Sequence, residues 1–222
     1  MPVVDLAFRL VGEAIPADHG YLLYSALSRE APLLHSAGDK GAGAAGELGV
    51  HPINGRLSGE RRLALTPSSR LTIRLDIALL AQLLPLVGKT LTLGGTKLQV
   101  GVPEVRVLVP AARLRSRLVT IKNAVEPDTF LEATRKKLAE LKVQGEPGLL
   151  RRQGAKALEG RSGISPDRCP FIRRTLRIKD KEVVGYALEV RGLDAEDSIR
   201  LQETGLGGRR RFGCGVFVGA RE

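Results

Sequence analysis

The pattern of hydrophobic and polar positions predicts alternating strands and helices in the first half of the chain. Apolar and polar residues alternate through residues 3–12, and this period of two predicts a strand. Apolar residues then recur at helical spacing, which predicts a helix that Asp18 caps and that ends near Pro32. Shorter patterns predict strands at 50–57, 61–66, 70–75 and 104–109, a short buried helix at 76–86, and a hairpin at Gly94-Gly95.

The second half of the chain shows a similar order of elements. Alternation predicts a strand at 117–122 and a hairpin at 173–191, and helical spacing predicts helices at 128–141 and 194–203. Residues 144–170 show no periodicity, and a final strand is predicted at Gly-Val-Phe-Val, residues 215–218. Each half thus follows the strand and helix order of a ferredoxin-like βαββαβ fold. We therefore expect an α+β protein with two tandem ferredoxin-like domains, 1–112 and 113–222.

The net charge of the chain indicates what kind of partner it binds. The 222 residues carry a formal net charge of +11, an excess that usually marks an anionic partner, most commonly a nucleic acid. An acidic membrane surface is the rival partner, but the chain has no polybasic amphipathic helix and no lipidation motif. It also shows no signal peptide and no run of about 18 uncharged apolar residues, so we expect a cytoplasmic protein without a membrane partner.

The residues give little support to metal, disulfide or nucleotide chemistry. Cys169 and Cys214 form no close-spaced pair, and the three histidines are scattered, so we expect reduced thiols and no zinc site. Gly88-Lys89-Thr90 resembles the end of a phosphate-binding loop. Leu83 stands where the leading glycine of such a loop belongs, which argues against nucleotide hydrolysis. We expect neither a metal nor a cofactor.

The C-terminal segment 205–215 combines five glycines with three consecutive arginines. Glycine lets backbone N–H groups approach phosphates closely, and arginine binds phosphate through paired hydrogen bonds. A glycine-rich turn before the last strand, with a solvated basic face, explains the same residues, and the pattern leaves both interpretations open. On the first interpretation, the residues that contact RNA are Gly205, Gly207, Gly208, Arg209, Arg210, Arg211, Gly213 and Gly215.

A second basic region covers residues 151–181, which contain ten arginines and lysines but three acidic residues. Arginines in an irregular loop and on the following hairpin suit the phosphate backbone of an RNA stem. We expect Arg173, Arg174 and Arg177 on the hairpin to contact RNA. The alternative is a basic face that only keeps the protein soluble.

Two segments together resemble a known family. The glycine-rich loop 205–215 is one, and the other is His19-Gly-Tyr-Leu-Leu-Tyr-Ser-Ala-Leu-Ser-Arg29, followed by Leu-Leu-His35. They resemble the CRISPR repeat-processing endoribonucleases, of the RAMP superfamily with tandem ferredoxin-like domains. The resemblance implies metal-independent cleavage of CRISPR precursor RNA within the repeat, leaving 2′,3′-cyclic phosphate and 5′-hydroxyl ends. It implies a hairpin repeat RNA, and other subunits of a type I CRISPR effector complex, as partners.

The resemblance also implies the catalytic residues. His35 matches the family's general base or acid, Tyr24 its helix tyrosine, and Lys40 its nearby lysine. RNA supplies its own 2′-hydroxyl nucleophile, so cleavage needs only a base, an acid and a cation. His19 is an alternative catalytic histidine, and His51 is interpreted as structural. A non-catalytic RNA-binding subunit of a CRISPR ribonucleoprotein and an unrelated basic RNA-binding protein remain the rival functions.

Overall fold

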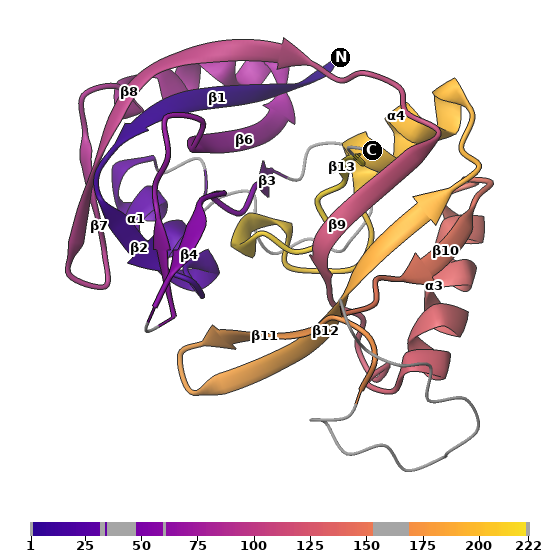
Figure 1. Ribbon diagram of the computed structural model, residues 1–222. Coiled ribbons are helices and arrows are strands. Elements are labelled where there is room, and N and C mark those ends of the chain that lie inside the picture. The colour runs from indigo at the N-terminus through magenta and orange to yellow at the C-terminus, as the bar shows by residue number, and fades with distance from the viewer. Residues whose placement is uncertain (1, 32–33, 35–47, 60, 153–168, 221–222) are drawn as a thin grey trace.

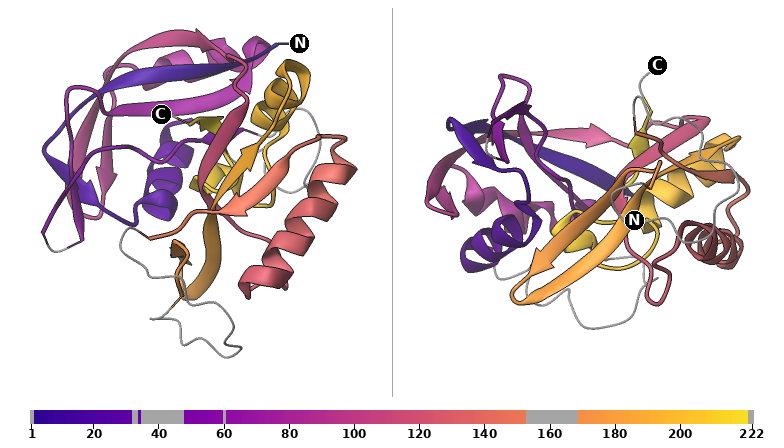
Figure 2. Two further views of the ribbon diagram at one scale, coloured as in Figure 1. Left: turned by 45° about the vertical axis from the view of Figure 1, so that its right-hand side comes forward. Right: turned by 60° about the horizontal axis from the view of Figure 1, so that its bottom comes forward.

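Two antiparallel sheets, one from each half of the chain, form the protein (Figure 1). The structure is a computed structural model that describes residues 2–31, 34, 48–59, 61–152 and 169–220. Sheet 1 lies on the left of Figure 1 and sheet 2 on the right, where the hairpin β11–β12 extends toward helix α1 (Figure 2).

Sheet 1 has the strand order β3-β6-β1-β8-β7. The central strand β1 pairs antiparallel with both β6 and β8. The elements of this half are β1 (Val3–Val11), β2 (Ala14–Pro16), α1 (Gly20–Glu30), β3 (Gly49–Val50), β4 (Arg56–Ser58), β5 (Arg62–Ala64), β6 (Arg70–Asp76), the 3-10 helix η1 (Ile77–Leu86), β7 (Thr90–Leu93) and β8 (Thr96–Val107). The short strands β2, β5 and β4 form a small sheet of their own.

Sheet 2 repeats this arrangement with the order β10-β12-β9-β13, and β11 pairs with β12. Its elements are β9 (Arg113–Val119), α3 (Pro127–Glu140), β10 (Glu146–Leu149), β11 (Arg173–Ile178), β12 (Lys181–Arg191), α4 (Ala195–Thr204), the 3-10 helix η3 (Arg210–Phe212) and β13 (Val218–Gly219). In sheet 1 the first strand, β1, lies between β6 and β8, and in sheet 2 the first strand, β9, lies between β12 and β13, which is the ferredoxin-like arrangement. The predicted α+β fold with tandem ferredoxin-like units is confirmed.

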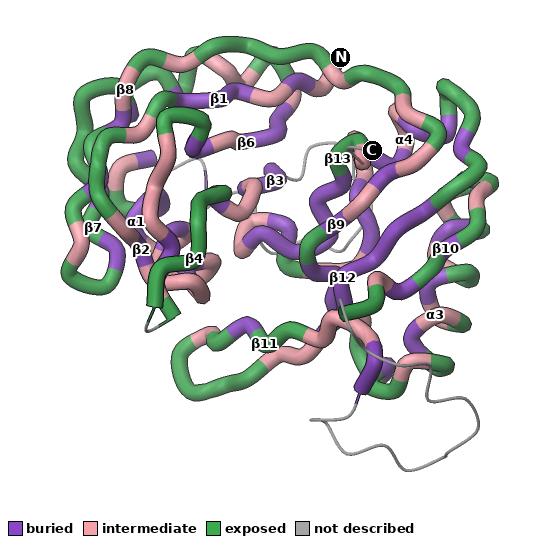
Figure 3. Tube along the Cα trace, viewed as in Figure 1, coloured by how far each residue is buried: buried purple, intermediate pink, exposed green. Residues whose placement is uncertain are grey.

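Each sheet buries one face in a core of its own (Figure 3). In sheet 1 the alternating residues Leu6 and Phe8 of β1 pack against Leu23 and Leu27 of α1. In sheet 2 Tyr186 and Leu188 of β12 pack against Phe130 of α3, whose ring meets Tyr186 edge-on at 5.0 Å. The buried residues of the first core end at Val100 and those of the second begin at Leu114. The domain boundary after residue 112 stays a prediction.

Several element predictions need correction. Asp18 does not cap α1: the N-cap residue is His19, and no side chain caps the helix. The predicted strand 50–57 is interrupted at Pro52, which has no N–H to donate, and it separates into β3 and β4 in different sheets. Strand β9 begins at Arg113 rather than 117. The predicted hairpin at Gly94-Gly95 is confirmed as β7 and β8, and the strand predicted separately at 104–109 is the end of β8, which stops at Val107.

The last strand is shorter than predicted. Only Val218 and Gly219 pair with β9, and the predicted strand 215–218 is otherwise irregular. Gly215 has a left-handed φ of 66°, which breaks the extended backbone. The Phe217 carbonyl accepts a hydrogen bond from Arg74 of sheet 1 instead of joining a strand ladder.

Candidate nucleic-acid interface

The glycine-rich loop 205–215 packs against helix α1 through an aromatic and arginine cluster. The Arg211 guanidinium donates to the Tyr24 hydroxyl over 3.2 Å, and its carbon lies 5.3 Å from the centre of the Tyr24 ring. The Phe212 ring meets Tyr24 edge-on, with 4.7 Å between the ring centres. The structure therefore brings a predicted catalytic residue, Tyr24, together with a predicted RNA-binding residue, Arg211, across 187 positions of the chain.

The glycines of the loop allow its backbone to lie directly against β9. Gly207 has a φ of 80°, and a Cβ there would lie 2.4 Å from the Thr120 carbonyl oxygen. Gly215 donates its N–H to the Leu118 carbonyl over 2.7 Å. Left-handed backbone and such close contacts both exclude a side chain. These glycines therefore shape the turn before the last strand, one of the two roles that the sequence left open.

Gly208 differs from Gly207, because a Cβ on Gly208 meets no atom within 4 Å. We expect Gly207→Ala to lower the free energy of unfolding by about 1–3 kcal/mol, because it adds a backbone clash to a strained φ. Gly208→Ala should change it by less than about 0.5 kcal/mol. Denaturant unfolding of both variants measures the difference. Equal losses of stability would mean that the Gly207 contact does not hold the loop.

The three arginines of the loop lie in different surroundings. Arg209 is exposed, and Arg211 is half-buried against Tyr24. Arg210 is only 3% exposed, and its Nη2 atom lies 3.4 Å from the position that a Cβ on Gly49 would take. Of the three side chains, Arg209 is thus the most open to RNA. Arg210 packs inside the protein, so a direct RNA contact through Arg210 would need a change in the loop.

The β11–β12 hairpin carries the other predicted RNA-binding arginines. Arg174 and Arg177 are exposed, and Arg173 is half-buried. The backbone N–H of Arg177 donates to the Asp18 carboxylate over 3.3 Å, and this contact joins the hairpin to the residues just before α1. The hairpin and the glycine-rich loop therefore both meet α1, and the predicted RNA-binding segments share one region between the two sheets.

His19 is enclosed and has hydrogen-bond partners within the protein. Its ring is 1% exposed, with Nδ1 3.0 Å from the Pro16 carbonyl, while Nε2 accepts the Ile53 N–H over 2.9 Å. Both ring nitrogens are used, which places the ring proton on Nδ1. Burial, followed by the charge of Arg117, lowers the pKa of His19 to about 4. A neutral, enclosed imidazole with two partners is poorly suited to proton transfer with RNA.

His51 belongs to a charged network that joins the two sheets. Its Nε2 donates to the Asp5 carboxylate over 3.2 Å, and Arg74 donates to both oxygens of the same carboxylate over 2.7 and 2.8 Å. Arg74 is 1% exposed and also donates to the carbonyls of Gln202 and Phe217 in the second half. The structural interpretation of His51 agrees with this network. The sequence did not predict the role of Arg74, because no motif or spacing around this residue indicates that it joins the two sheets.

Two predicted catalytic residues, His35 and Lys40, lie outside the described residues. Leu34, which precedes His35, is described and is buried in the core of sheet 1 at 1% exposure. Their catalytic roles therefore stay predictions from the sequence.

Both cysteines are free and buried. Burial raises the pKa of the Cys214 thiol to about 12, so it stays protonated near neutral pH and is a poor nucleophile. Across the described ranges, no group of three or more His, Cys, Asp or Glu residues is placed to hold a metal ion. Among the helices of those same ranges, none combines the length and apolar character needed to cross a membrane.

Comparison with known proteins identifies the class of this fold. A chain of 13% identity, a CRISPR associated protein Cas6, matches with a TM-score of 0.64 over 99% of this chain and 100% of its own. A Cas6-related protein from Pyrococcus furiosus, 12% identical, matches with a TM-score of 0.62 over 97% of this chain and 98% of its own. The protein thus has the tandem ferredoxin-like fold of those structures.

Sequence comparison identifies the family. A family model described as "Cas6 Crispr" matches residues 4–222. The chain is 39% identical over 218 residues to the CRISPR-associated endonuclease Cas6 of Myxococcus xanthus (strain DK1622), an alignment that spans 98% of this chain and 82% of that protein. The chain belongs to the Cas6 family, and the resemblance stated from the glycine-rich loop and the first helix is confirmed.

Proposed function

We propose that this chain is an endoribonuclease that cuts CRISPR precursor RNA within the repeat. The observation that carries the proposal is the 39% identity, over 98% of the chain, to a protein named as a CRISPR-associated endonuclease. The net charge of +11 and the arginines beside α1 support an RNA substrate. The expected product is a guide RNA that stays with other subunits of a type I CRISPR complex.

The chemistry proposed is internal attack by the RNA 2′-hydroxyl, which leaves a 2′,3′-cyclic phosphate and a 5′-hydroxyl. In this step the 2′-hydroxyl gives its proton to a base and its oxygen bonds to phosphorus. The bond from phosphorus to the 5′ oxygen breaks, and an acid gives a proton to that leaving oxygen. His35 is proposed as the acid or base, Tyr24 as the residue that assists it, and Lys40 as the cation that stabilises the charged phosphorane. The contact of Arg211 with Tyr24 supports a second cation near the tyrosine.

Cleavage should proceed in EDTA and should depend on one 2′-hydroxyl. We expect a labelled hairpin repeat to be cut at one position with EDTA present. A repeat with a 2′-deoxy nucleotide just upstream of the cut should bind with unchanged affinity and stay intact, because the nucleophile is missing. Gel analysis of the products, with a phosphatase test for the cyclic end, measures both expectations.

Two results would contradict the proposed chemistry. Normal cleavage of the 2′-deoxy substrate would rule out internal attack, and loss of all cleavage in EDTA would rule out a metal-independent reaction. Tight binding of every repeat without any cut, with and without divalent metal, would instead favour the non-catalytic RNA-binding subunit.

A further inference from the structure

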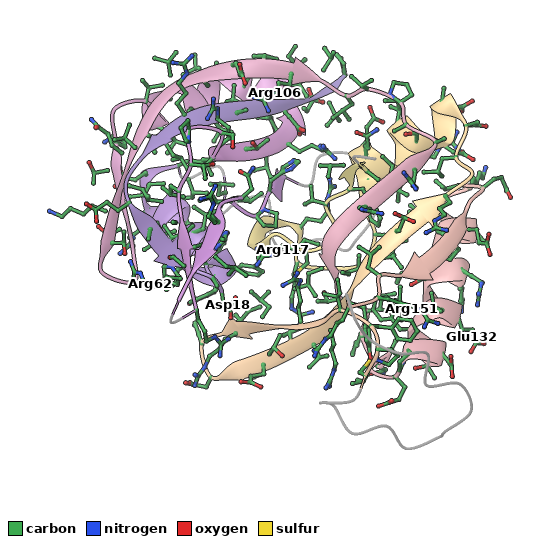
Figure 4. All side chains as sticks on the ribbon, in the orientation of Figure 1. Asp18, Arg62, Arg106, Arg117, Glu132 and Arg151 are labelled. Carbon is green, nitrogen blue, oxygen red and sulfur yellow. The ribbon has the colours of Figure 1, made fainter. Side chains whose placement is uncertain are left out.

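A cavity lies between the start of helix α1 and the second half of the chain. Its volume is about 290 Å³, at the lower end of the range for small-ligand pockets. Figure 4 labels Asp18, on the side of sheet 1, and Arg117, on the side of sheet 2, and both line this cavity. The cavity is distinct from the contact between Tyr24 and Arg211, although Phe212 lines the cavity and its ring also contacts Tyr24.

Four arginines from three segments line the cavity, namely Arg61, Arg117 of β9, and Arg173 and Arg174 of β11. Asp18 is the one carboxylate in the lining, and its oxygen already accepts the Arg177 N–H. The remaining wall includes apolar surface from Leu118, Leu176 and Phe212. A positively charged rim over an apolar floor suits a ligand that is anionic at one end and flat and apolar at the other.

Two of these arginines, Arg117 and Arg174, lie close enough for their charges to repel each other. Partial burial lowers the pKa of Arg117, and the charge of Arg174 lowers it further. Arg174 has an exposed side chain, yet the protein atoms packed around it displace part of its water, which lowers its pKa, and the charge of Arg152 lowers that pKa further. Both guanidinium groups stay charged, since arginine does not lose its proton in proteins. Arg117 is fixed across the gap by donating to the Ala17 carbonyl over 3.3 Å. An anion in the cavity would relieve this repulsion.

The first turn of α1 adds a second attraction for an anion. Gly20, the first residue of this 11-residue helix, lines the cavity, and no side chain caps the helix start. Backbone N–H groups at a helix start carry partial positive charge and favour phosphate. The neighbouring His19 ring does not compete for a ligand, because both of its nitrogens have partners within the protein.

We propose that this cavity binds one nucleotide of the RNA substrate, next to the candidate catalytic tyrosine. Arg117 and Arg174 hold its backbone phosphate, and its sugar and base lie against Leu118, Leu176 and Phe212. The inference rests on the proposed function, because that function makes RNA the ligand. Since Phe212 also contacts Tyr24, a nucleotide held here fixes the RNA strand relative to the site of cleavage.

The test combines two arginine substitutions with single neutral phosphates in the RNA. We expect Arg117→Gln/Arg174→Gln to raise the Kd for repeat RNA by about 10- to 100-fold, since hydrogen bonds to charged groups are the strong ones. We also expect that, in a series of repeat RNAs that each carry one neutral methylphosphonate linkage, the linkage at one position weakens binding to the wild-type protein. A methylphosphonate at that same position should leave the Kd of the double variant unchanged, because the arginines that contact the phosphate are already absent.

The matched control is Arg135→Gln/Lys136→Gln on α3, two exposed cations outside the cavity lining that remove the same net charge. We expect less than about a threefold change in Kd there, because surface charges act weakly at a distance. Thermal unfolding of both variants checks that they fold. Equal weakening in both variants, or no methylphosphonate position whose effect disappears, would overturn the inference while leaving the nuclease intact. A wild-type protein that binds no repeat RNA would overturn the proposed function as well.

Discussion

Replacing His35 by alanine should lower single-turnover cleavage of repeat RNA by about 10²–10⁴-fold, the usual contribution of a general acid or base. Histidine gives and takes a proton near neutral pH, and the reaction needs both transfers. Affinity for the uncut repeat should change little, because a neutral imidazole attracts phosphate weakly. Rapid-mixing cleavage under enzyme excess and filter binding of a 2′-deoxy repeat measure the two quantities separately.

The other two histidines of the chain serve structure. His19 has both ring nitrogens in hydrogen bonds within the protein, and His51 binds the buried Asp5 carboxylate. The control is therefore His19→Ala, which should lower stability and leave the cleavage rate of the folded fraction near wild type. Tyr24→Phe should cause a smaller loss than His35→Ala, because it removes only a hydroxyl. A wild-type cleavage rate in His35→Ala would refute the assignment of His35.

The order of elements was predictable because each sheet buries a single face. In β1 the core residues Val4, Leu6 and Phe8 alternate with residues outside the core cluster, so the period of two is visible in the sequence. The helices α1 and α3 show their buried stripes in the same way. Because this order of strands and helices occurs once in each half of the chain, the sequence predicts the tandem ferredoxin-like fold.

The ends of strands were less predictable, because tertiary contacts decide them. The run at 215–218 has the composition of a strand, yet the Phe217 carbonyl binds Arg74, 143 positions away in the chain. The β9 segment Arg113-Leu-Arg-Ser-Arg117 reads as basic, but alternate positions, Leu114 and Ser116, are buried. That period of two predicts a strand, and it also places Arg117 on the exposed face of that strand.

The candidate site was predictable in its residue types and not in its contacts. The resemblance indicated Tyr24 and the glycine-rich loop separately. Neither pattern indicates that Arg211 donates to the Tyr24 hydroxyl, or that Arg210, the residue before it, is buried. Arg209 is the N-cap of the 3-10 helix Arg210–Phe212, and Arg210 and Arg211 lie within it, so the three consecutive arginines have three different environments.

Arg74→Met should lower the free energy of unfolding at pH 7 by about 3–5 kcal/mol, the usual cost of removing one partner from a buried ion pair. The substitution leaves Asp5 without its two bonds from Arg74, and it removes the donor from the Gln202 and Phe217 carbonyls. Denaturant unfolding measures the loss. The matched control is Arg106→Met, because the Arg106–Glu104 pair on β8 is about half exposed and should contribute less than about 1 kcal/mol.

Removing both charges together tests whether the pair, rather than the shape of the side chain, accounts for the loss. Asp5→Asn/Arg74→Met should be less destabilised than Arg74→Met alone, because no unpaired buried charge remains. Burial alone would raise the pKa of Asp5, but hydrogen bonds from His51 and Arg74 hold it well below its usual value. The carboxylate therefore stabilises the fold above about pH 4, its unfolded pKa. That stability is lost as the pH falls further, through the folded pKa. Wild type should lose stability steeply below pH 4, and Asp5→Asn should lose less over the same range. Identical acid profiles for the two proteins would show that the Asp5 charge does not contribute to joining the two halves of the chain.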